Sequence, residues 1–572
     1  MKYVINLFLA LILIFSACTG ESINPDTEVP VDPTEPEAPV DKETSTPCDY
    51  DFNSTSANDT LIIECSHDLN GQKIMLPENV IIDYKGGEII NGELNFKQAG
   101  IIDGRLLNHQ LGVTGSVKLN SSTYTFDKNK WGIVEGIVSD EIALDNKNLF
   151  QRAINDVKRL GAINFNIDQL DAYFLVTSDR NLVLPFETSI HLPSNFNLKM
   201  ADNANLRVQP NKYVRYNLLE IRGQSNVTIT GGKLHGDRDK HDYTPIYDTN
   251  GRLRTTHEWG HLINISSGVD ITISDVIMQN AAGDGLNIHS MKYAFDPEYI
   301  GSNNVLVTGC TFDSNRRNNM SITDGYNIIV ENNSFLNAGV DTQYSEGTSP
   351  KCGIDVEAYR TRDDNGNLIE YQIAKDITIR NNIEKGSMAS AFTIAIGQDI
   401  TIENNTTENT IGFSLANGVR IINNVINAQA DDVALKGGKP QNSETIFNNE
   451  ISGNTVNSGN LGISIYNQDI DVYDNIIKNC KTGIMINDII GSNIYGNKIS
   501  SDVTNSYGIF THIASADKVQ IYENDINTTF KPIAFVNVNI EQGTEANQIT
   551  LSNNELNGGE VSISNSNGII VN

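Results

Sequence analysis

Alternating apolar residues recur along most of this chain in one short pattern: apolar, any, apolar, any, small, Asn. Successive copies lie roughly 21 to 25 residues apart, with longer gaps where loops are inserted. A strand this short cannot bury its own apolar face, so each copy must stack on its neighbours. The repeat therefore predicts an all-β fold, a right-handed parallel β-helix. The copies are DITIRNNI (376–383), DITIENNT (399–406), GVRIINNV (418–425), DIDVYDNI (469–476), KVQIYEND (518–525) and QITLSNNE (548–555).

The Asn that closes each copy predicts an internal ladder. Its amide would bond to the same turn of the next repeat, as stacked Asn side chains do in other parallel assemblies. Asn405 is one such residue, and Asn333 is its equivalent in NIIVENNS, whereas Cys310 takes the place in NVLVTGCT. We expect this column to be structural rather than a ligand site.

A second strand recurs as small, apolar, any, apolar, any, for example in GDGLNIH (283–289) and KCGIDVEAY (351–359). Side chains alternate along a strand, so its two apolar positions point into the coil and the other two point outward. Stacking then creates two outward columns, in which neighbours lie roughly 4.8 Å apart. The predicted first column is Glu220, Asn264, Asn287, Ser321, Asp355, Thr393, Ser414, Ala434 and Ser464; the second is Arg222, Ser266, His289, Thr323, Glu357, Ala395, Ala416, Lys436 and Tyr466.

Two carboxylates and two arginines stand out on this face. Asp355 and Glu357 lie on one strand, roughly 6.6 Å apart at Cα. Arg316 and Arg317 lie at the turn one repeat earlier, so we expect all four side chains to meet on one surface. Like charges this close, beside guanidinium groups, titrate as a coupled acid and base. The alternative is a solvated face with incidental salt bridges.

Further polar residues are candidates for the same site. Asp284 and His289 lie two repeats before Glu357, close enough for substrate contact and for a part in catalysis. In THEWGH (256–261) an exposed Trp would suit a sugar ring as a stacking platform, and the segment lacks the HExxH spacing of a metalloprotease. The residues predicted to bind substrate are His257, Glu258, Trp259, Asn287, Asn318, Asp431, Asp432, Lys436 and Tyr466.

Composition and charge narrow the classes of partner. Gly, Asn, Ile, Val and Thr are abundant, which favours many short strands joined by tight turns. The formal net charge of -30 argues against nucleic-acid binding, because no basic stripe exists to neutralise phosphates. It also disfavours polyanionic substrates, although a locally basic groove would override the global field.

The N-terminus has the features of an export signal. Residues 1–18 contain one Lys, an apolar run and small residues before Cys18, a pattern typical of a bacterial lipoprotein signal peptide. Cys18 would then be lipidated; an ordinary cleaved signal is the alternative. Residues 19–46 are acidic and rich in Pro, so we expect an extended linker. The prediction is an exported outer-membrane lipoprotein that contacts the membrane only through its lipid anchor.

Residues 47–128 are predicted to form a small β module of stacked short strands before the coil, which would occupy 129–572. Cys48 and Cys65 could pair across its first segment, and the cysteines at 310, 352 and 480 look like buried apolar residues. No Cys or His spacing suits zinc. We expect no cofactor; calcium is possible because many carboxylates are exposed, although no segment has an EF-hand ligand order.

From about residue 130 to 560 the chain resembles the pectate-lyase-like superfamily of right-handed β-helices, which includes polysaccharide lyases, polygalacturonase-type glycoside hydrolases and phage tailspikes. DNKNLFQRAINDVKRLGA (145–162) resembles the amphipathic helix that caps such coils. GDGLNI and DDVALKGG resemble aspartate-bearing segments of the polygalacturonases, with Asp284, Asp431 and Asp432 at the matching places. They lie five repeats apart here, and the GHG and RIK segments of that family are absent, so its mechanism is not carried over.

Three functions fit these residues. The favoured one is a glycoside hydrolase acting on a polysaccharide or complex glycan, with Asp355 and Glu357 as acid and base or nucleophile. The second is a lyase or epimerase of a uronate-containing glycan, which would use Arg316, Arg317, His289 or Lys436. The third is a noncatalytic surface protein that binds glycans.

Overall fold

The computed structural model describes residues 45–572 apart from 177–184, 248–250, 441–443, 513–514 and 539–547. The predicted signal peptide, Cys18 and nearly all of the predicted linker lie outside the described residues. No helix in the described part of the chain is long and apolar enough to cross a membrane. The described residues form one compact unit, 45–572.

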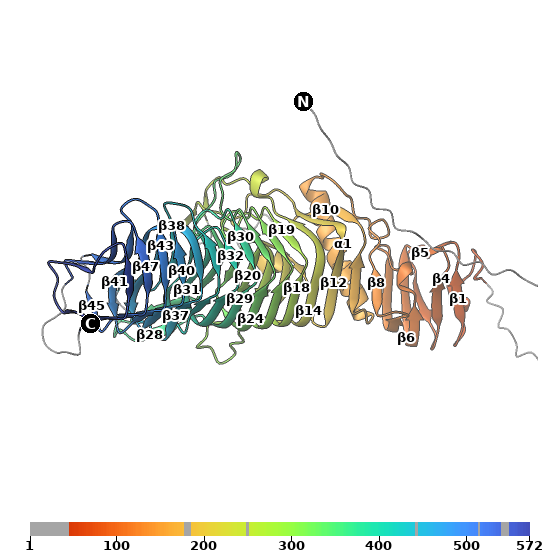
Figure 1. Ribbon diagram of the computed structural model, residues 1–572. Helices are drawn as coiled ribbons and strands as arrows, with labels where there is room; N and C mark the ends of the chain where they lie inside the picture. The colour runs from red at the N-terminus through yellow and green to blue at the C-terminus, as the bar shows by residue number, and fades with distance from the viewer. Residues whose placement is uncertain (1–44, 177–184, 248–250, 441–443, 513–514, 539–547) are drawn as a thin grey trace, which may run out of the picture. The chain divides into compact units, whose positions relative to one another are not determined.

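Forty-one strands form a single continuous ladder that runs from β8 (Thr123–Thr125) to β52 (Ile569–Val571), and the rungs succeed one another in chain order (Figure 1). Every strand-to-strand pairing that builds the coil is parallel, as in β18–β21 and β21–β24. The strands fall on three faces of the coil. One face carries β18 (Val269–Ser274), β21 (Asn303–Thr308), β24 (Gly325–Glu331) and β29 (Ala374–Arg380); a second carries β19 (Ile277–Gln279), β22 (Thr311–Asp313), β25 (Ser334–Leu336) and β30 (Ile383–Lys385).

The third face carries the outward columns. Its strands are β13 (Arg215–Arg222), β17 (Trp259–Ser266), β20 (Leu286–His289), β23 (Met320–Ile322), β26 (Cys352–Glu357), β31 (Ser390–Glu403), β33 (Ile411–Asn417), β36 (Val433–Gly437) and β38 (Thr455–Gln468). The registers place Glu220, Asn264, Asn287, Ser321, Asp355 and Thr393 in one line, as the alternation predicts.

Between Thr393 and Ser464 the predicted columns are wrong, whereas Ser464 itself lies in the first column as predicted, since it pairs with Lys436. Strand β31 has one extra residue, Ala395, so Glu357 pairs with Ile396 instead. A bulge of this kind opposes two residues to one and shifts the register that follows. A separate difference precedes this bulge: Thr393 pairs with Gly412, and Gly412 with Lys436, in place of the expected Ser414 and Ala434. Lys436 therefore belongs to the first column, in line with Asp355, and not to the second.

The amphipathic segment forms the predicted helix, α1 (Asp140–Arg159). Ser139 caps it by accepting a hydrogen bond from Ile142 N, and acidic residues lie in its first turn, where the helix dipole favours them. The ring of Phe150 is fully buried and packs against Phe165 of β9 (Asn164–Ile167) and against Phe174 at the end of β10 (Leu170–Phe174). The helix thus covers the apolar residues of the first rungs.

The N-terminal segment forms stacked short strands, as predicted. All its pairings are parallel: β1 (Thr60–Ile63) with β4 (Ile81–Tyr84), β4 with β6 (Gly92–Ile102), β3 (Lys73–Leu76) with β6, β6 with β7 (Leu111–Leu119), and β2 (Ser66–Asp68) with β5 (Glu88–Ile90). Arg152 of α1 donates hydrogen bonds to the carbonyls of His109 and Leu111, which ties this stack to the helix.

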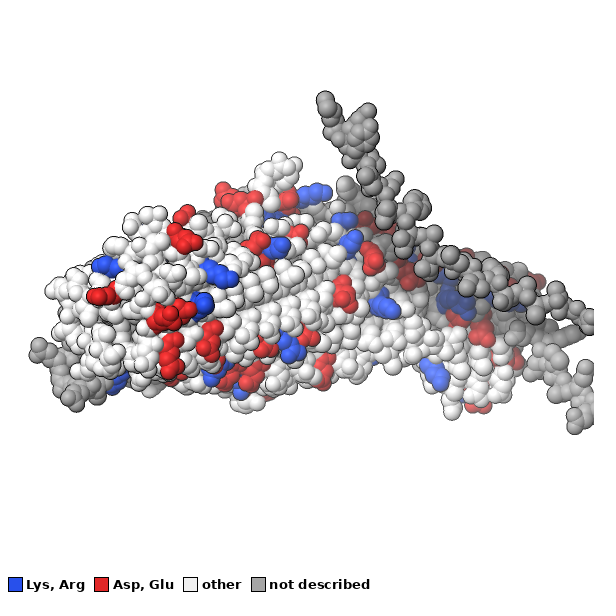
Figure 2. Space-filling model, in the orientation of Figure 1, with Lys and Arg blue, Asp and Glu red and all other residues white. Residues whose placement is uncertain are grey.

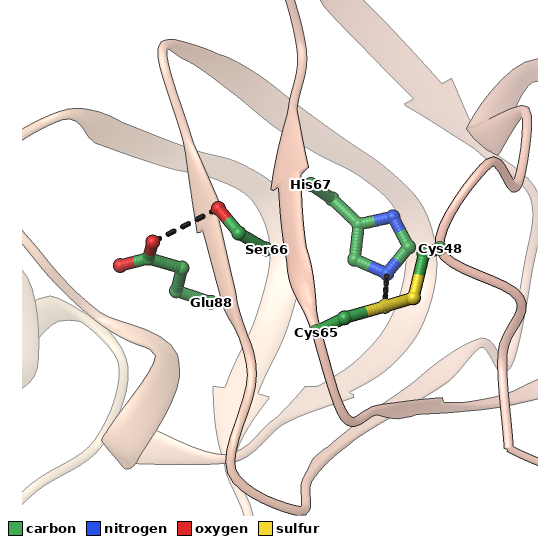
Figure 3. Close-up of a disulfide and its surroundings, with 5 residues drawn as sticks. All are labelled: Cys48, Cys65, Ser66, His67 and Glu88. Atoms are coloured by element: carbon green, nitrogen blue, oxygen red, sulfur yellow. Dashed lines mark hydrogen bonds between the residues drawn. A yellow bond between two sulfur atoms is a disulfide. The ribbon is translucent and has the colours of Figure 1, made fainter.

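Cys48 and Cys65 form a disulfide, which fixes the start of the folded chain against β2 (Figure 3). Beside it, His67 Nε2 lies 3.8 Å from the sulfur of Cys65, and Ser66 Oγ donates to Glu88 Oε1 at 2.9 Å. The other three cysteines of the described chain, at 310, 352 and 480, are reduced and buried, as their sequence context predicts.

The predicted asparagine ladder is present. Asn382 Nδ2 donates to Asn405 Oδ1 at 3.0 Å, and Asn405 Nδ2 donates to Asn424 Oδ1 at 2.9 Å. Each side-chain oxygen also accepts the backbone N–H of the preceding member, so buried donors on successive rungs are satisfied together. The ladder comprises Asn333, Asn382, Asn405, Asn424, Asn454, Asn475, Asn497, Asn524 and Asn554.

We expect Asn405→Leu to lower the free energy of unfolding by on the order of 1 to 3 kcal/mol, because it leaves buried amide and N–H groups on two rungs without partners. Denaturant unfolding followed by circular dichroism measures this. Asn365→Leu, in the exposed turn between β27 (Arg360–Arg362) and β28 (Leu368–Glu370), is the control and should change stability little. Equal stability of both variants and the parent would contradict a structural ladder.

Candidate functional site

A cleft of about 640 Å³ lies over the outward face at β13, β17 and β20. Its floor consists of column residues, among them Arg222, and its walls carry aromatic rings and Arg215. Trp259 and Tyr293 belong to these walls. The guanidinium of Arg215 lies 4.7 Å from the ring centroid of Trp259. This arrangement of a polar floor between aromatic walls suits a polar ligand with flat apolar faces.

The floor is held together by a buried carboxyl group. Glu220 has no exposed surface and accepts hydrogen bonds from Asn217 Nδ2 at 2.8 Å and from Asn264 Nδ2 at 2.9 Å. On the next rung, Asn287 Nδ2 donates to Asn264 Oδ1 at 2.9 Å. Burial raises the pKa of Glu220, because the low-dielectric surroundings disfavour its charged form.

His289 lies on the second column beside this floor. Its Nε2 is 2.8 Å from Ser266 Oγ, and its Nδ1 is 2.8 Å from the carbonyl oxygen of Ser290. Burial lowers the pKa of His289 to about 4. The imidazole is therefore neutral at physiological pH.

Further along the first column a second network surrounds Asp355. Asp284, nearly fully buried, accepts from Arg317 Nη1 at 3.0 Å and from Ser321 Oγ at 2.9 Å. Asn318 Nδ2 donates to Asp355 Oδ2 at 3.3 Å, while the backbone N–H of Asn318 donates to Asp284 Oδ1 at 2.9 Å. The structure thus brings Asp284, Arg317, Asn318 and Asp355 together, whereas the sequence predicts only the proximity of Arg317 to Asp355.

Asp355 combines burial with a neighbouring negative charge. Only 3% of its surface is exposed, whereas Glu357, two residues later, is exposed. Burial and the charge of Glu357 raise the pKa of Asp355 to about 7, and the charge of Arg317 opposes this rise only in part. Near neutral pH the pair therefore contains a carboxylic acid that can give up a proton beside a solvent-accessible carboxyl group.

Arg316 does not join this group, contrary to the sequence expectation. Its guanidinium donates to the carbonyls of Glu346, at 2.8 Å, and Thr256, at 2.5 Å, and lies 4.0 Å from the ring centroid of Tyr243. These contacts hold inserted loops against the coil. Successive residues at this turn project to different sides, so Arg317 reaches Asp284 and Arg316 does not.

The three loop residues predicted to bind substrate separate in the structure. Trp259 lines the cleft, as expected. His257 does not: it is 1% exposed, and its Nδ1 lies 3.0 Å from Nε2 of His241, which in turn contacts Asp237 at 2.7 Å. This buried chain fixes the inserted loop and leaves no ring face of His257 for a ligand. Glu258 is partly exposed but does not line the cleft.

The remaining candidates lie further along the coil and do not line this cleft. Lys436 is exposed three rungs beyond Asp355, roughly 14 Å away by strand spacing. Asp431 is exposed, and Asp432 and Tyr466 are partly exposed. Their position is compatible with the outer subsite that the sequence suggested, separate from the carboxyl pair.

Sequence reasoning missed the loops that wall the cleft. Tyr299 OH donates to Asp324 Oδ1 at 2.8 Å, and Ile373 N donates to Asp324 Oδ2 at 2.9 Å. Asp324 therefore anchors two loops, which bring Tyr293 and Gln372 to the cleft. Burial raises the pKa of Asp324 to about 6. The sequence predicts the column position of Glu220 but not its part in the site. An acidic residue at the start of an outward column is the sequence signal that points to such a part.

Figure 2 shows the charged side chains on one face of the molecule. Asp and Glu are scattered there with Lys and Arg between them, and no continuous basic stripe is visible on that face. Within the described ranges, no group of three or more His, Cys, Asp or Glu side chains is arranged to hold a metal ion.

No family model matches the chain. Over 322 residues it is 30% identical to the uncharacterized protein YclG of Bacillus subtilis (strain 168), which covers 55% of this chain and 53% of that protein. Over 294 residues it is 29% identical to the SPbeta prophage-derived uncharacterized protein YorA of the same organism, which covers 51% and 48%. The chain therefore spans about half the length of the curated relatives it matches.

Among solved structures, the chain is similar to a mutant tailspike protein of E. coli bacteriophage HK620 in complex with a pentasaccharide. The TM-score is 0.52 at 12% identity, over 79% of this chain and 80% of that chain. At this identity the similarity concerns the fold alone. Together with the parallel ladder, it confirms the right-handed parallel β-helix that the repeats and the resemblance to the pectate-lyase-like superfamily predict.

The raised pKa of Asp355 makes a prediction about stability. A folded-state pKa above the unfolded value means that folding favours the protonated acid, so its contribution is complete below about pH 4 and is lost as pH rises through about 7. The amide of Asp355→Asn does not ionise, so this variant loses no stability in that pH range. We expect the variant to match the parent at pH 4 and to exceed it at pH 8 by up to about 4 kcal/mol, at about 1.4 kcal/mol per pKa unit.

Urea unfolding at the two pH values measures this difference. Asp364→Asn, in an exposed turn, is the control and should follow the parent at both. If the free energy of unfolding of Asp355→Asn stays parallel to that of the parent across the range, the acid is not held protonated by the fold.

Proposed function

We propose that this chain is a carbohydrate-active enzyme that hydrolyses glycosidic bonds of a polysaccharide or complex glycan. The observation that carries the proposal is the pair formed by Asp355 and Glu357. Glycosidic hydrolysis needs one carboxylic acid that protonates the leaving oxygen and one carboxylate that acts as base or nucleophile. Burial supplies the first at Asp355, and exposure leaves Glu357 open to solvent and substrate.

In this mechanism Asp355 is the general acid. Asn318 donates to its Oδ2 and so orients the carboxyl group, and Arg317, paired with Asp284, limits the rise of its pKa. Glu357 then acts on the opposite side of the bond, as a base through water or directly as a nucleophile. The cleft lies at β13, β17 and β20, four, three and two rungs before Asp355, and would hold the sugar units on one side of the scissile bond.

The fold supports a glycan as ligand. The HK620 tailspike, which shares the fold, was solved with a bound pentasaccharide. Here the walls of the cleft carry Trp259, Tyr293 and Phe186, whose rings suit the apolar faces of sugars. The floor carries amide and hydroxyl groups from Asn264, Asn287 and other column residues, which suit sugar hydroxyls.

A lyase or epimerase of a uronate-containing glycan is the second candidate. It is favoured by Arg215 and Arg222, because guanidinium groups bind carboxylates and stabilise charge that develops beside them. A lyase yields an unsaturated product that absorbs ultraviolet light, whereas a hydrolase releases reducing ends without that absorbance. Retained affinity for a glycan with neither product would indicate a noncatalytic binding protein.

We expect Asp355→Asn and Glu357→Gln each to lower turnover by at least about a hundredfold on a glycan that the parent cleaves, the scale of losing a positioned acid or base. Chromatography of a glycan panel identifies the substrate and measures the rate. Asp364→Asn is the control. Asp432→Asn should raise KM rather than lower kcat, because we assign Asp432 to an outer subsite. Full activity in both carboxyl variants would remove the hydrolase mechanism.

We also propose that the protein is exported and anchored by a lipid on Cys18. Acyl chains supply the anchoring free energy, so Cys18→Ser should move the protein from the membrane fraction to the soluble fraction. Fractionation of cells, followed by immunoblotting, measures the partition. An unchanged partition in Cys18→Ser would show that something other than this lipid holds the protein at the membrane.

A further inference from the structure

Three side chains in the floor of the cleft form a continuous chain: Glu220, Ser266 and His289. Ser266 Oγ lies 3.1 Å from Glu220 Oε1 and 2.8 Å from His289 Nε2. His289 Nδ1 lies 2.8 Å from the carbonyl oxygen of Ser290. A carbonyl oxygen can only accept, so Nδ1 of His289 carries a hydrogen.

The number of hydrogens in this chain is fixed by its contacts. The contact of Ser266 with Glu220 and its contact with His289 each require one hydrogen, and the hydroxyl of Ser266 supplies only one. Asn264 Nδ2 also donates to Ser266 Oγ, at 3.0 Å, and lies 3.3 Å from His289 Nε2, but neither contact puts a hydrogen between Ser266 and an end group of the chain. We therefore assign the second hydrogen to Glu220 or to His289 Nε2. Together the three groups hold one proton more than a carboxylate and a neutral imidazole would.

With these contacts alone, this proton belongs on Glu220. Burial raises the pKa of Glu220 and lowers that of His289, and both effects favour the uncharged pair. Oε2 of Glu220 already accepts from the amides of Asn217 and Asn264, so Oε1 is the oxygen that carries the hydrogen. Glu220 then donates to Ser266, and Ser266 donates to His289.

We propose that Glu220, Ser266 and His289 form a proton relay that makes His289 an imidazolium when an anionic group of a ligand binds beside Arg222. The O–H bond of Glu220 breaks as a bond to Ser266 Oγ forms, and the hydroxyl hydrogen of Ser266 passes to His289 Nε2. The products are a carboxylate and an imidazolium, and the net charge is unchanged. No proton from solvent is needed.

The surroundings of the relay indicate that the ligand group which triggers it is negatively charged. Arg222, Ser266 and His289 occupy successive rungs of the second column, and Arg222 and His289 both line the cleft. The charged or titratable groups that act on the relay are Arg222 of β13, for both Glu220 and His289, and His261 of β17, for His289. An anion beside Arg222 offsets the repulsion that an imidazolium would feel. A carboxylate or a sulfate has the required charge.

This relay goes beyond the proposed hydrolysis, in which Asp355 is the acid four rungs away, and it stands without it. Infrared difference spectra between the parent and Glu220→Gln at pH 7 test the resting state. We expect the parent to show the C=O stretch of one un-ionised carboxylic acid that the variant lacks. The matched control is Glu384→Gln, since all four partners of the buried Glu384 are N–H donors. A Glu220→Gln spectrum without this loss overturns the relay.

The response to anions is tested by nitrogen NMR of histidine-labelled protein, with His289 assigned from His289→Gln. Trigalacturonate and inorganic sulfate are the anionic probes, and the methyl ester of trigalacturonate is the neutral control. We expect an anionic probe to protonate Nε2 of His289, and calorimetry in buffers of different ionisation enthalpy to show no net proton uptake. A response to trigalacturonate alone identifies a sugar carboxylate, and a response to sulfate alone identifies a sulfate site.

Ser266→Ala breaks the chain while both end groups remain. In that variant, protonation of His289 should consume about one proton per site from the buffer, or anion affinity should fall at least about tenfold. Asp355→Asn should leave all these readouts unchanged, so hydrolysis can fail while the relay holds. A parent that takes up one proton from buffer, or a His289 that stays neutral with both anions, refutes the proposed transfer.

Discussion

Each rung of this coil depends on the rung beside it, because a single turn can bury neither its apolar side chains nor its backbone polar groups. Parallel pairing satisfies the backbone polar groups along the whole ladder. The inward apolar residues of successive strands bury one another with almost no exposed surface, as in Ile271, Val305 and Ile328. The Asn ladder extends the same principle to the turns. Stacking is therefore the constraint that fixes where the outward side chains lie.

The outward columns follow directly from this constraint. Strand pairing sets the spacing within a column at roughly 4.8 Å whatever the side chains are. The coil can therefore hold two carboxyl groups close together even though no attraction between them favours that distance. What the coil does not provide is burial. The inserted loops provide it: Asp324 anchors the segments that carry Tyr293 and Gln372, and Arg316 holds the loops that reach Tyr243. The stacked rungs determine the distances between the outward side chains, and the inserted loops determine how deeply those side chains are buried.

This division explains what could be predicted from sequence. Alternation is local, so the repeats predicted the coil and the line from Glu220 through Asn287 to Asp355. The bulge at Ala395 could not be predicted, because one extra residue leaves the local pattern almost unchanged. The pairing of Thr393 with Gly412 could not be predicted either, because moving the alignment by two residues keeps the same alternation of inward and outward positions.

The two neighbouring arginines show the second kind of limit. Arg316 and Arg317 have the same chemistry and adjacent positions, so no local pattern distinguishes them. Carbonyls at residues 256 and 346, brought in by distant loops, attract the first, and Asp284 attracts the second. The burial of Glu220 has a different origin, since its amide partners lie on its own strand and on the next rung of the coil. For Arg316, contacts made by inserted loops decide the outcome, and the geometry of these loops is not encoded in the repeat.

The acids of the first column bear on how the net charge of -30 should be interpreted. Glu220 and Asp355 lie about 19 Å apart by rung spacing, with amide and hydroxyl groups between them, and burial raises the pKa of both. Asp284, beside them, is paired with Arg317. Acids that are protonated or paired add little negative field to the cleft, whereas Arg215 and Arg222 add positive field. The formal charge of the chain therefore does not exclude an anionic ligand here, because local burial reverses the sign that composition suggests.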